Sequence, residues 1–187
     1  FLHLLRAFGS DSHAEPAFAQ CRGPREVGYY LTFGRIMGSP EPLDIANARC
    51  ITLIGAHLGE NMHNTQVQDL ATAIGRGAEL VVVDPRFSTA AGKARYWLPI
   101  KPGTDVVLLN SLAHVILEEG LEERAYIEAH TMGFDAFAEV VKGYDPRTAS
   151  HACGIDEDAI RNVARTYARA GAAMTICTMG INQSTHG

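Results

Sequence analysis

The sequence has no long hydrophobic run, and this absence argues against a membrane-spanning protein. No stretch approaches the ~18 consecutive apolar residues that a spanning helix needs. Positive charge is also scarce: the formal net charge is -5, which gives no basic surface for nucleic acid. Of the 187 residues, 47% are hydrophobic, enough for the core of one large or two small domains. We therefore expect a globular protein with no direct membrane insertion and no nucleic acid partner.

Cysteine is too rare and too widely spaced to hold the fold together. The four cysteines form no CxxC pair and lie at Cys21, Cys50, Cys153 and Cys177. This spacing argues against a disulfide framework and against a zinc cluster. Cys50 and Cys177 lie in apolar, strand-like runs, where a small buried side chain is the ordinary interpretation. Cys21 differs, because its neighbours Arg22 and Gly23-Pro24 are typical of a polar loop.

Two short apolar runs predict buried parallel strands. They are residues 50–56 (CITLIGA) and 79–85 (ELVVVDP), each rich in β-branched residues and bounded by turn residues. Between them, residues 63–76 have helical spacing and end in glycines. This is a βαβ unit, for which a right-handed crossover is expected. Residues 96–100 (YWLPI) predict a further short strand.

Helical periodicity resumes after these strands. Residues 103–120 predict a long helix, with Thr104 as the expected capping residue and Asp105 in the first turn. Residues 122–141 predict two short helices separated at Met132-Gly133.

The last third of the chain completes an alternating pattern. Residues 154–171 predict an amphipathic helix capped by Asp156, and residues 172–180 return as a strand. The pattern predicts an α/β fold, an open Rossmann-like and mostly parallel sheet with helices on both faces. Residues 38–42 (GSPEP) form a natural break before it. Because the chain begins at Phe1 rather than Met, we expect an internal fragment of a larger multidomain subunit.

Ligands of open α/β sheets bind beyond the carboxyl ends of the strands, so the loops there are the candidates. Residues 55–61 (GAHLGEN) lead into a helix and suit a phosphate, or else form a tight packing turn. They lack the GxGxxG pattern of ordinary NAD sites. Asp84 in DPR is placed to bind ribose hydroxyls or to form an Asp-Pro turn. Asp105 in KPGTD suits the N–H donors of a guanine edge, or helix capping alone.

Three segments, taken together, resemble a known family. In chain order they are VVVDPR, ARYWLPIKPGTDVVLLNSLAHVI and MGINQ. They resemble the molybdopterin oxidoreductases of the dimethyl-sulfoxide-reductase superfamily, in the expected order over nearly the whole chain. The resemblance implies an oxidoreductase with a bis-molybdopterin guanine dinucleotide cofactor that carries molybdenum or tungsten. It also implies a 4Fe-4S cluster in the missing N-terminal part of the protein.

The resemblance gives Cys21 a role. In that family a Cys, selenocysteine or Ser ahead of the βαβ unit ligates the metal, and Cys21 stands at that position. A helix start at Pro24 and the cations Arg22 and Arg25 favour the thiolate, which is the ligating form. A thiolate is also a soft donor that suits a metal held by dithiolene sulfurs. Cys21 is thus the implied metal ligand.

The resemblance also implies a domain division and a set of cofactor contacts. Residues 1–40 belong to a metal-proximal subdomain, and residues 41–187 form an incomplete dinucleotide-binding α/β domain. The implied contacts are Gly55, His57, Gly59, Glu60 and Asn61 along a pyrophosphate, Asp84, Pro85 and Arg86 at a guanosine ribose or base, Gly103 and Asp105 at the guanine, and Gly180 and Gln183 in a pterin-side loop. His57 departs from the Asn that relatives commonly carry.

The substrate class depends on Arg22, which directly follows the implied metal ligand where formate dehydrogenases have His. A guanidinium cannot act as an ordinary base, but it suits an oxo- or sulfur-anion. We therefore expect Arg22 to be catalytic toward a small anionic substrate, unless it only pairs with Glu26. The segments GYYLTFG and GSPEPLDIANARC most resemble the branch that reduces polysulfide, thiosulfate or tetrathionate in anaerobic respiration.

Several alternatives stay open within and beyond this family. A formate dehydrogenase or an arsenate reductase would share the cofactor. A non-catalytic iron–sulfur subunit of a respiratory NADH-quinone oxidoreductase would share the fold, although Cys21 argues against it. The implied partners are an iron–sulfur electron-transfer subunit and, as a further candidate, a membrane anchor subunit. The resemblance favours the periplasm, with the cytoplasm as the alternative location.

Overall fold

The computed structural model describes residues 2–10, 12, 23–35, 42–56, 58–59 and 64–184. The chain divides into two compact units, Phe1–Gly38 and Ser39–Gly187. The first unit contains the helices α1 (Leu2–Phe8) and α3 (Gly23–Phe33). The second unit contains the sheet. The roles assigned to residues 1–40 and 41–187 stay predictions.

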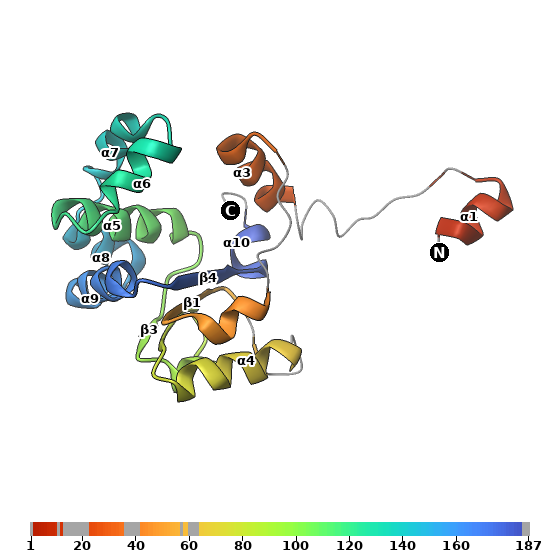
Figure 1. Cartoon of the computed structure of the whole chain (residues 1–187), viewed down its shortest axis with the longest axis horizontal. Helices are drawn as coiled ribbons and strands as arrows, with labels where there is room; N and C mark the ends of the chain where they lie inside the picture. Colours follow the sequence, from red (N-terminus) through yellow and green to blue (C-terminus); the bar gives the residue numbers. More distant parts are fainter. Residues whose placement is uncertain are drawn as a thin grey trace. The chain divides into compact units, whose positions relative to one another are not determined.

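The described part of the second unit contains one four-stranded parallel sheet (Figure 1). Its strands are β1 (Cys50–Ile54), β2 (Glu79–Val83), β3 (Tyr96–Leu98) and β4 (Ala173–Cys177). They lie in the order β3-β2-β1-β4, so β1 is central. All four lie within the runs that the sequence pattern predicted as strands, and the mostly parallel sheet is confirmed.

The remaining elements precede, connect or follow these strands. The helix between β1 and β2 and the long helix after β3 were both predicted, as was the break at Met132-Gly133 between two short helices. The elements are η1 (Pro42–Asn47), α4 (Asn64–Gly75), η2 (Ala91–Lys93), α5 (Asp105–Glu118), α6 (Arg124–His130), α7 (Phe134–Val141), α8 (Pro146–Cys153), α9 (Glu157–Arg169) and α10 (Met179–Asn182).

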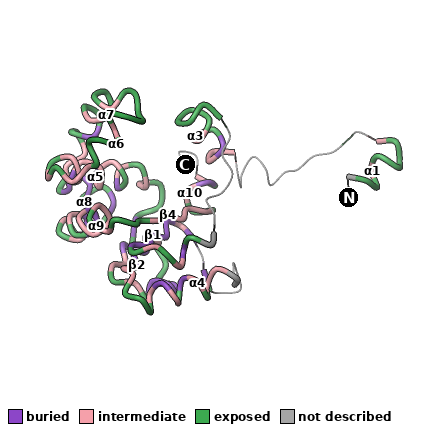
Figure 2. The backbone as a smooth tube through the Cα atoms, in the orientation of Figure 1, coloured by how far each residue is buried: buried purple, intermediate pink, exposed green. Residues whose placement is uncertain are grey.

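Alternating strand residues build two separate cores, one on each face of the sheet. On one face, Cys50 and Val81 pack with residues of α5, α8 and α9. On the other face, Ile51 and Leu80 pack with residues of α4 and η1. Figure 2 shows buried residues in β1 and also in the helices that flank the sheet, such as α4, α5 and α8. Because successive side chains of a strand point to opposite faces, a fully buried strand such as β1 requires a helical layer on each side. The prediction of helices on both faces is confirmed.

Two of the strand cysteines behave as small core residues. Cys50 is completely buried, and this burial raises the pKa of its thiol. Cys177 is partly buried and packs against the same core. A thiol with a raised pKa is a poor nucleophile and a poor metal ligand at neutral pH, because both roles require the thiolate. The structural interpretation of Cys50 therefore holds.

The predicted helix caps had mixed outcomes. Asp156 caps α9 as expected, because its carboxylate accepts the N–H of Ala159 at 3.1 Å. The predicted cap by Thr104 is wrong. Thr104 does precede α5, but its hydroxyl donates to the carbonyl of Lys101 at 2.7 Å and caps no helical N–H. The amide of Thr104 donates to the same carbonyl at 3.3 Å, so both the amide and the hydroxyl of Thr104 are used by the turn that begins at Lys101.

Helix α8 was not predicted, although its start carries a recognisable signal. Asp145 accepts the N–H groups of Arg147 and Thr148, both at 3.1 Å, and Pro146 occupies the first helical position. The helix ends at Gly154, whose φ of 74° is left-handed. Asp-Pro at the start and Gly at the end form a common helix signature. The eight-residue helix between them is too short for its periodicity to stand out.

The cap of α8 can be tested by replacing Asp145 with alanine (D145A). Loss of a capping side chain costs about 1 kcal/mol, so amide protection in α8 should fall about fivefold in hydrogen exchange. The pKa of Asp145 is lowered, chiefly by the hydroxyl of Thr148. Its contribution is therefore present above the unfolded-state pKa and is lost as the pH falls through the folded-state pKa.

The matched control is Asp158→Ala, which removes an exposed carboxylate from the first turn of α9 without removing a cap. Its α9 amides should keep nearly wild-type protection. Equal losses of protection in the two variants would show that helix-end charge, rather than the cap, holds α8.

Candidate functional site

The carboxyl ends of the strands lie at one edge of the sheet. The register pairs Ile54 with both Val83 and Cys177, and Val83 with Leu98, so all four strands end at the same level. The loops that follow them carry the described members of the predicted cofactor site. The structure thus brings four separate sequence segments to one edge, as the ligand rule for open α/β sheets requires.

At the centre of this edge two predicted site glycines touch. Gly55 has a left-handed φ of 53°, and a Cβ atom added to it would lie 2.5 Å from Cα of Gly180. A Cβ atom added to Gly180 would lie equally close to Cα of Gly55, at 2.5 Å. The amide of Gly180 donates to the carbonyl of Gly55 at 3.2 Å. Only glycine permits this approach at either position, so the packing interpretation of the turn holds. The pyrophosphate contact stays a prediction.

This contact lies at the point where the chain changes direction across the sheet. β1 has β2 on one side, reached through α4, and β4 on the other side, reached after α9. Such a reversal of strand order is where open α/β sheets form a ligand-binding crevice. Here the loop after β1 and the loop after β4 are in direct backbone contact, at Gly55 and Gly180.

The DPR segment forms a turn that is stabilised by two hydrogen bonds at Asp84, one to its side chain and one to its backbone carbonyl. Oδ1 of Asp84 accepts the amide of Arg86 at 2.8 Å, a common Asx turn. The carbonyl of Asp84 accepts Nε1 of Trp97 at 2.9 Å. The ring of Trp97 also packs edge-on against Phe87, with the ring centroids 4.8 Å apart. The Asp-Pro turn is therefore present, whereas a ribose contact stays a prediction for Asp84, Pro85 and Arg86.

Trp97 is a site-supporting residue that sequence reasoning missed. It was noted only as part of a strand, but its indole N–H holds the turn that carries Asp84. The available signal was its rarity, since it is the sole tryptophan in the chain. A half-buried tryptophan usually finds a partner for its N–H.

The KPGTD loop places a half-buried carboxylate beside open space. Burial raises the pKa of Asp105, against the opposing effect of hydrogen bonds from the backbone of Asp105 and Gly103. Gly103 has a left-handed φ of 86°, and a Cβ atom there would have no neighbour within 4 Å. A carboxylate that has lost solvation gains from additional N–H donors. The guanine contact of Asp105 and Gly103 stays a prediction.

The pterin-side loop is only partly described. Gly180 and Gln183 lie in and just after the short helix α10, and both are exposed. Nε2 of Gln183 lies 3.4 Å from the sulfur of Met179. Gly59 is described as well, with a left-handed φ of 94° and the side chain of Val67 as the neighbour of an added Cβ.

The predicted metal ligand and its neighbour lie outside the described residues. This holds for Cys21 and Arg22, and also for His57, Glu60 and Asn61. Helix α3 begins at Gly23, which confirms the helix expected directly after Cys21. The roles of all five residues stay predictions.

The part of the chain that the structure describes contains neither a metal-ligand cluster nor a helix that could cross a membrane. Within this part, no three His, Cys, Asp or Glu side chains are grouped so that they could hold a metal ion. None of its helices combines the length and the apolar character that crossing a membrane would require.

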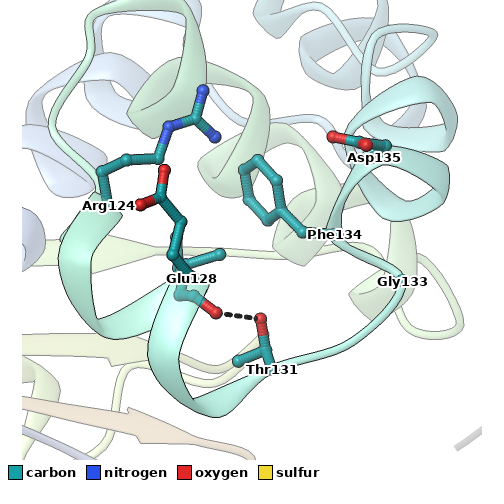
Figure 3. A pocket seen from close by; sticks show the side chains of 7 residues that line it. Arg124, Glu128, Thr131, Gly133, Phe134 and Asp135 are labelled. Atoms are coloured by element: carbon teal, nitrogen blue, oxygen red, sulfur yellow. Dashed lines mark hydrogen bonds between the residues drawn. The ribbon is translucent and has the colours of Figure 1, made fainter.

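A separate pocket of about 470 Å³ lies at α6 and α7 (Figure 3). The guanidinium of Arg124 lies over the ring of Phe134, 5.1 Å from its centroid. The hydroxyl of Thr131 donates to the carbonyl of Ile127 at 2.8 Å. None of the lining residues belongs to the predicted cofactor site. The pocket is therefore not part of the candidate site.

Comparison with known proteins identifies the family. Residues 3–187 match the family described as molybdopterin oxidoreductase, and the chain belongs to that family. It is 36% identical to a formate dehydrogenase subunit alpha of Methanocaldococcus jannaschii, over 82% of this chain and 22% of that protein. It is 32% identical to the molybdopterin-containing subunit of thiosulfate reductase of Salmonella typhimurium, over 89% of this chain and 21% of that protein.

A solved structure agrees with these matches. Acetylene hydratase from Pelobacter acetylenicus superposes with a TM-score of 0.82 and 28% identity, over 95% of this chain and 24% of that one. The chain thus spans about a quarter or less of each of these relatives. The resemblance drawn from the sequence is confirmed at the level of family, fold and oxidoreductase class.

The glycine contact can be tested with Gly55→Ala. A left-handed alanine costs about 1–2 kcal/mol, and overpacking adds about 1–3 kcal/mol, so the free energy of unfolding should fall by about 2–5 kcal/mol. Gly171→Ala is the matched control, because its φ of 69° is also left-handed but an added Cβ meets nothing within 4 Å. It should show the conformational cost alone. Denaturant unfolding of both variants measures the difference, and equal losses would mean that the two backbones can separate freely.

Proposed function

We propose that this chain is part of a molybdenum- or tungsten-dependent oxidoreductase that binds a bis-molybdopterin guanine dinucleotide, and that the carboxyl edge of the sheet holds a guanosine end of it. The observation that carries the proposal is the half-buried carboxylate of Asp105 beside the open space over Gly103. The family match over residues 3–187 supports it.

Each described loop has a distinct task in this proposal. The carboxylate of Asp105 accepts the paired N–H donors of the guanine edge, and Gly103 leaves room for the base. Asp84, whose backbone is fixed by Trp97, binds the ribose hydroxyls. The loop that starts at Gly55 lies along the pyrophosphate. The loop that carries Gly180 and Gln183 lies at the pterin. Four loops at one edge thereby bind one elongated ligand, and its affinity depends on their relative positions.

Cys21 is proposed as the protein ligand of the metal. The start of α3 at Gly23 and the neighbouring cations Arg22 and Arg25 favour its thiolate form. When bound, the cofactor supplies electron exchange with the substrate at its metal. For electron transfer we propose a 4Fe-4S cluster and an iron–sulfur partner subunit. Both would lie outside the residues of this chain.

The substrate is proposed to be a small anion, with a sulfur compound (polysulfide, thiosulfate or tetrathionate) as the first candidate. The permanent charge of Arg22, next to the proposed metal ligand, supports an anion. Similarity to a thiosulfate reductase supports sulfur. The formate dehydrogenase relative keeps formate as the second candidate, and formate is also a small anion. An acetylene hydratase shares the fold, so family membership alone does not select the substrate.

Asp105→Asn tests the guanine contact in the full-length protein. The variant should bind the cofactor about 10- to 100-fold more weakly, because it loses a charge-assisted hydrogen bond. The cofactor-free protein should instead be more stable at neutral pH, since an acid with a raised folded-state pKa destabilises the fold when ionised. That gain should disappear as the pH falls through the folded-state pKa. Guanosine monophosphate released per protein, together with thermal unfolding, measures both effects.

The control is Asp135→Asn, which removes an exposed carboxylate from the first turn of α7. Neither cofactor content nor stability should change appreciably. Full cofactor content in the Asp105→Asn variant would contradict the guanine contact.

Arg22→Lys and Arg22→Gln test the substrate class. Lysine keeps the charge without the planar fork, and should weaken turnover with the anion; glutamine should weaken it further, mainly by raising KM. Steady-state kinetics with polysulfide, tetrathionate, arsenate and formate compare the candidates directly. If formate is oxidised fastest and Arg22→Gln leaves that rate unchanged, the sulfur-anion proposal fails.

A further inference from the structure

Thr178, the residue directly after β4, contacts the loop that follows β1. Its hydroxyl donates to the carbonyl of Gly55 at 2.7 Å, although the two residues are 123 positions apart. Its amide donates to the carbonyl of Ile54 at 3.4 Å. The carbonyl of Gly55 also accepts the amide of Gly180. Both hydrogen bonds to this carbonyl therefore come from the segment after β4.

Thr178 also organises the segment that it begins. Its own carbonyl accepts the amides of Ile181 at 3.2 Å and Asn182 at 3.1 Å, which forms the turn of α10. Gln183 follows directly. Thr178 thus donates its amide to the end of β1 and its hydroxyl to the first residue of the loop that follows β1. Its carbonyl accepts hydrogen bonds within the loop after β4.

A side-chain hydrogen bond is needed here for a geometric reason. Gly55 and Gly180 have no side chains, so no interlocking of side chains can set the distance between their loops. The hydroxyl of Thr178 is half-buried, where a hydrogen bond competes less with water than at the surface. It is a directional side-chain contact that adds to the backbone hydrogen bond from Gly180 to Gly55.

We propose that Thr178 is a positioning residue that ties the loop after β1 to the loop after β4 and so sets the shape of the cofactor-binding edge. The inference rests on the proposed function, because it assumes that one ligand contacts both loops. A ligand that spans two loops loses affinity when they can shift relative to each other. Thr178 itself does not touch the reacting atoms.

Three substitutions in the full-length protein separate the hydroxyl from the shape of the side chain. Thr178→Val keeps the branched shape and removes the hydroxyl, and Thr178→Ala removes the hydroxyl with a smaller side chain. Thr178→Ser keeps the hydroxyl. The matched control is Thr175→Val, since Thr175 lies in β4 just before Thr178, and its hydroxyl donates to that of Tyr167, away from the loops, at 3.2 Å.

The measurements are the guanosine monophosphate and pterin content of each purified protein, and the rate of cofactor loss well below the unfolding temperature. Thr178→Val and Thr178→Ala should lose cofactor about 2- to 10-fold faster than wild type, the factor that one neutral hydrogen bond contributes. Thr178→Ser should restore near wild-type retention. Thr175→Val should retain cofactor normally even where its unfolding temperature falls as far as that of Thr178→Val.

The outcomes distinguish this inference from the proposed function. Wild-type protein without pterin or guanosine would overturn the proposed function itself. Wild-type protein that holds the cofactor, with Thr178→Val and Thr178→Ala losing it no faster than Thr175→Val, would overturn only the role of Thr178. Failure of Thr178→Ser to restore retention would also overturn it, because the hydroxyl would then not be the relevant group.

Discussion

The close approach of two backbones, at Gly55 and Gly180, is the constraint on which the candidate site depends. It joins the central strand to an edge strand at the point where the strand order reverses. Any side chain at either position would push the two loops apart. Since each loop also carries other predicted cofactor contacts, the spacing of those contacts is set by a contact that contains no side chain. The hydroxyl of Thr178 adds a directional hydrogen bond to this contact, because it donates to the carbonyl of Gly55.

The rest of the fold supports this edge. Both faces of the sheet are covered by helices, so β1 is fully buried between two packed cores. On the face covered by α5, α8 and α9, two side-chain nitrogens of Arg165 donate to the carboxylate of Glu119. This hydrogen bonding lowers the pKa of Glu119. Exposed ion pairs of this kind contribute little singly. The two apolar cores therefore dominate the stability of the scaffold.

Membership in the molybdopterin oxidoreductase family supports the proposed cofactor-binding role of this edge. The same fold segment occurs in proteins named for formate, thiosulfate and acetylene, which differ in charge and in chemistry. A scaffold shared by such different reactions is consistent with the proposal that the scaffold binds the cofactor and that residues near the metal select the substrate. Arg22 is proposed as one such residue, and the sheet edge as the shared part.

Local patterns in the sequence were sufficient for the βαβ unit, the two-sided helical cover and the cap at Asp156, because each depends on neighbouring residues or on a repeating period. The family likewise followed from contiguous motifs. Helix α8 was too short for its period to show, and Thr104 bonded to its own turn instead of capping a helix. Only the tertiary structure joined Gly55 to Gly180 and Thr178, and Trp97 to Asp84. These contacts connect residues far apart in the chain, and no local pattern encodes which distant backbone a residue will meet once the strands are paired.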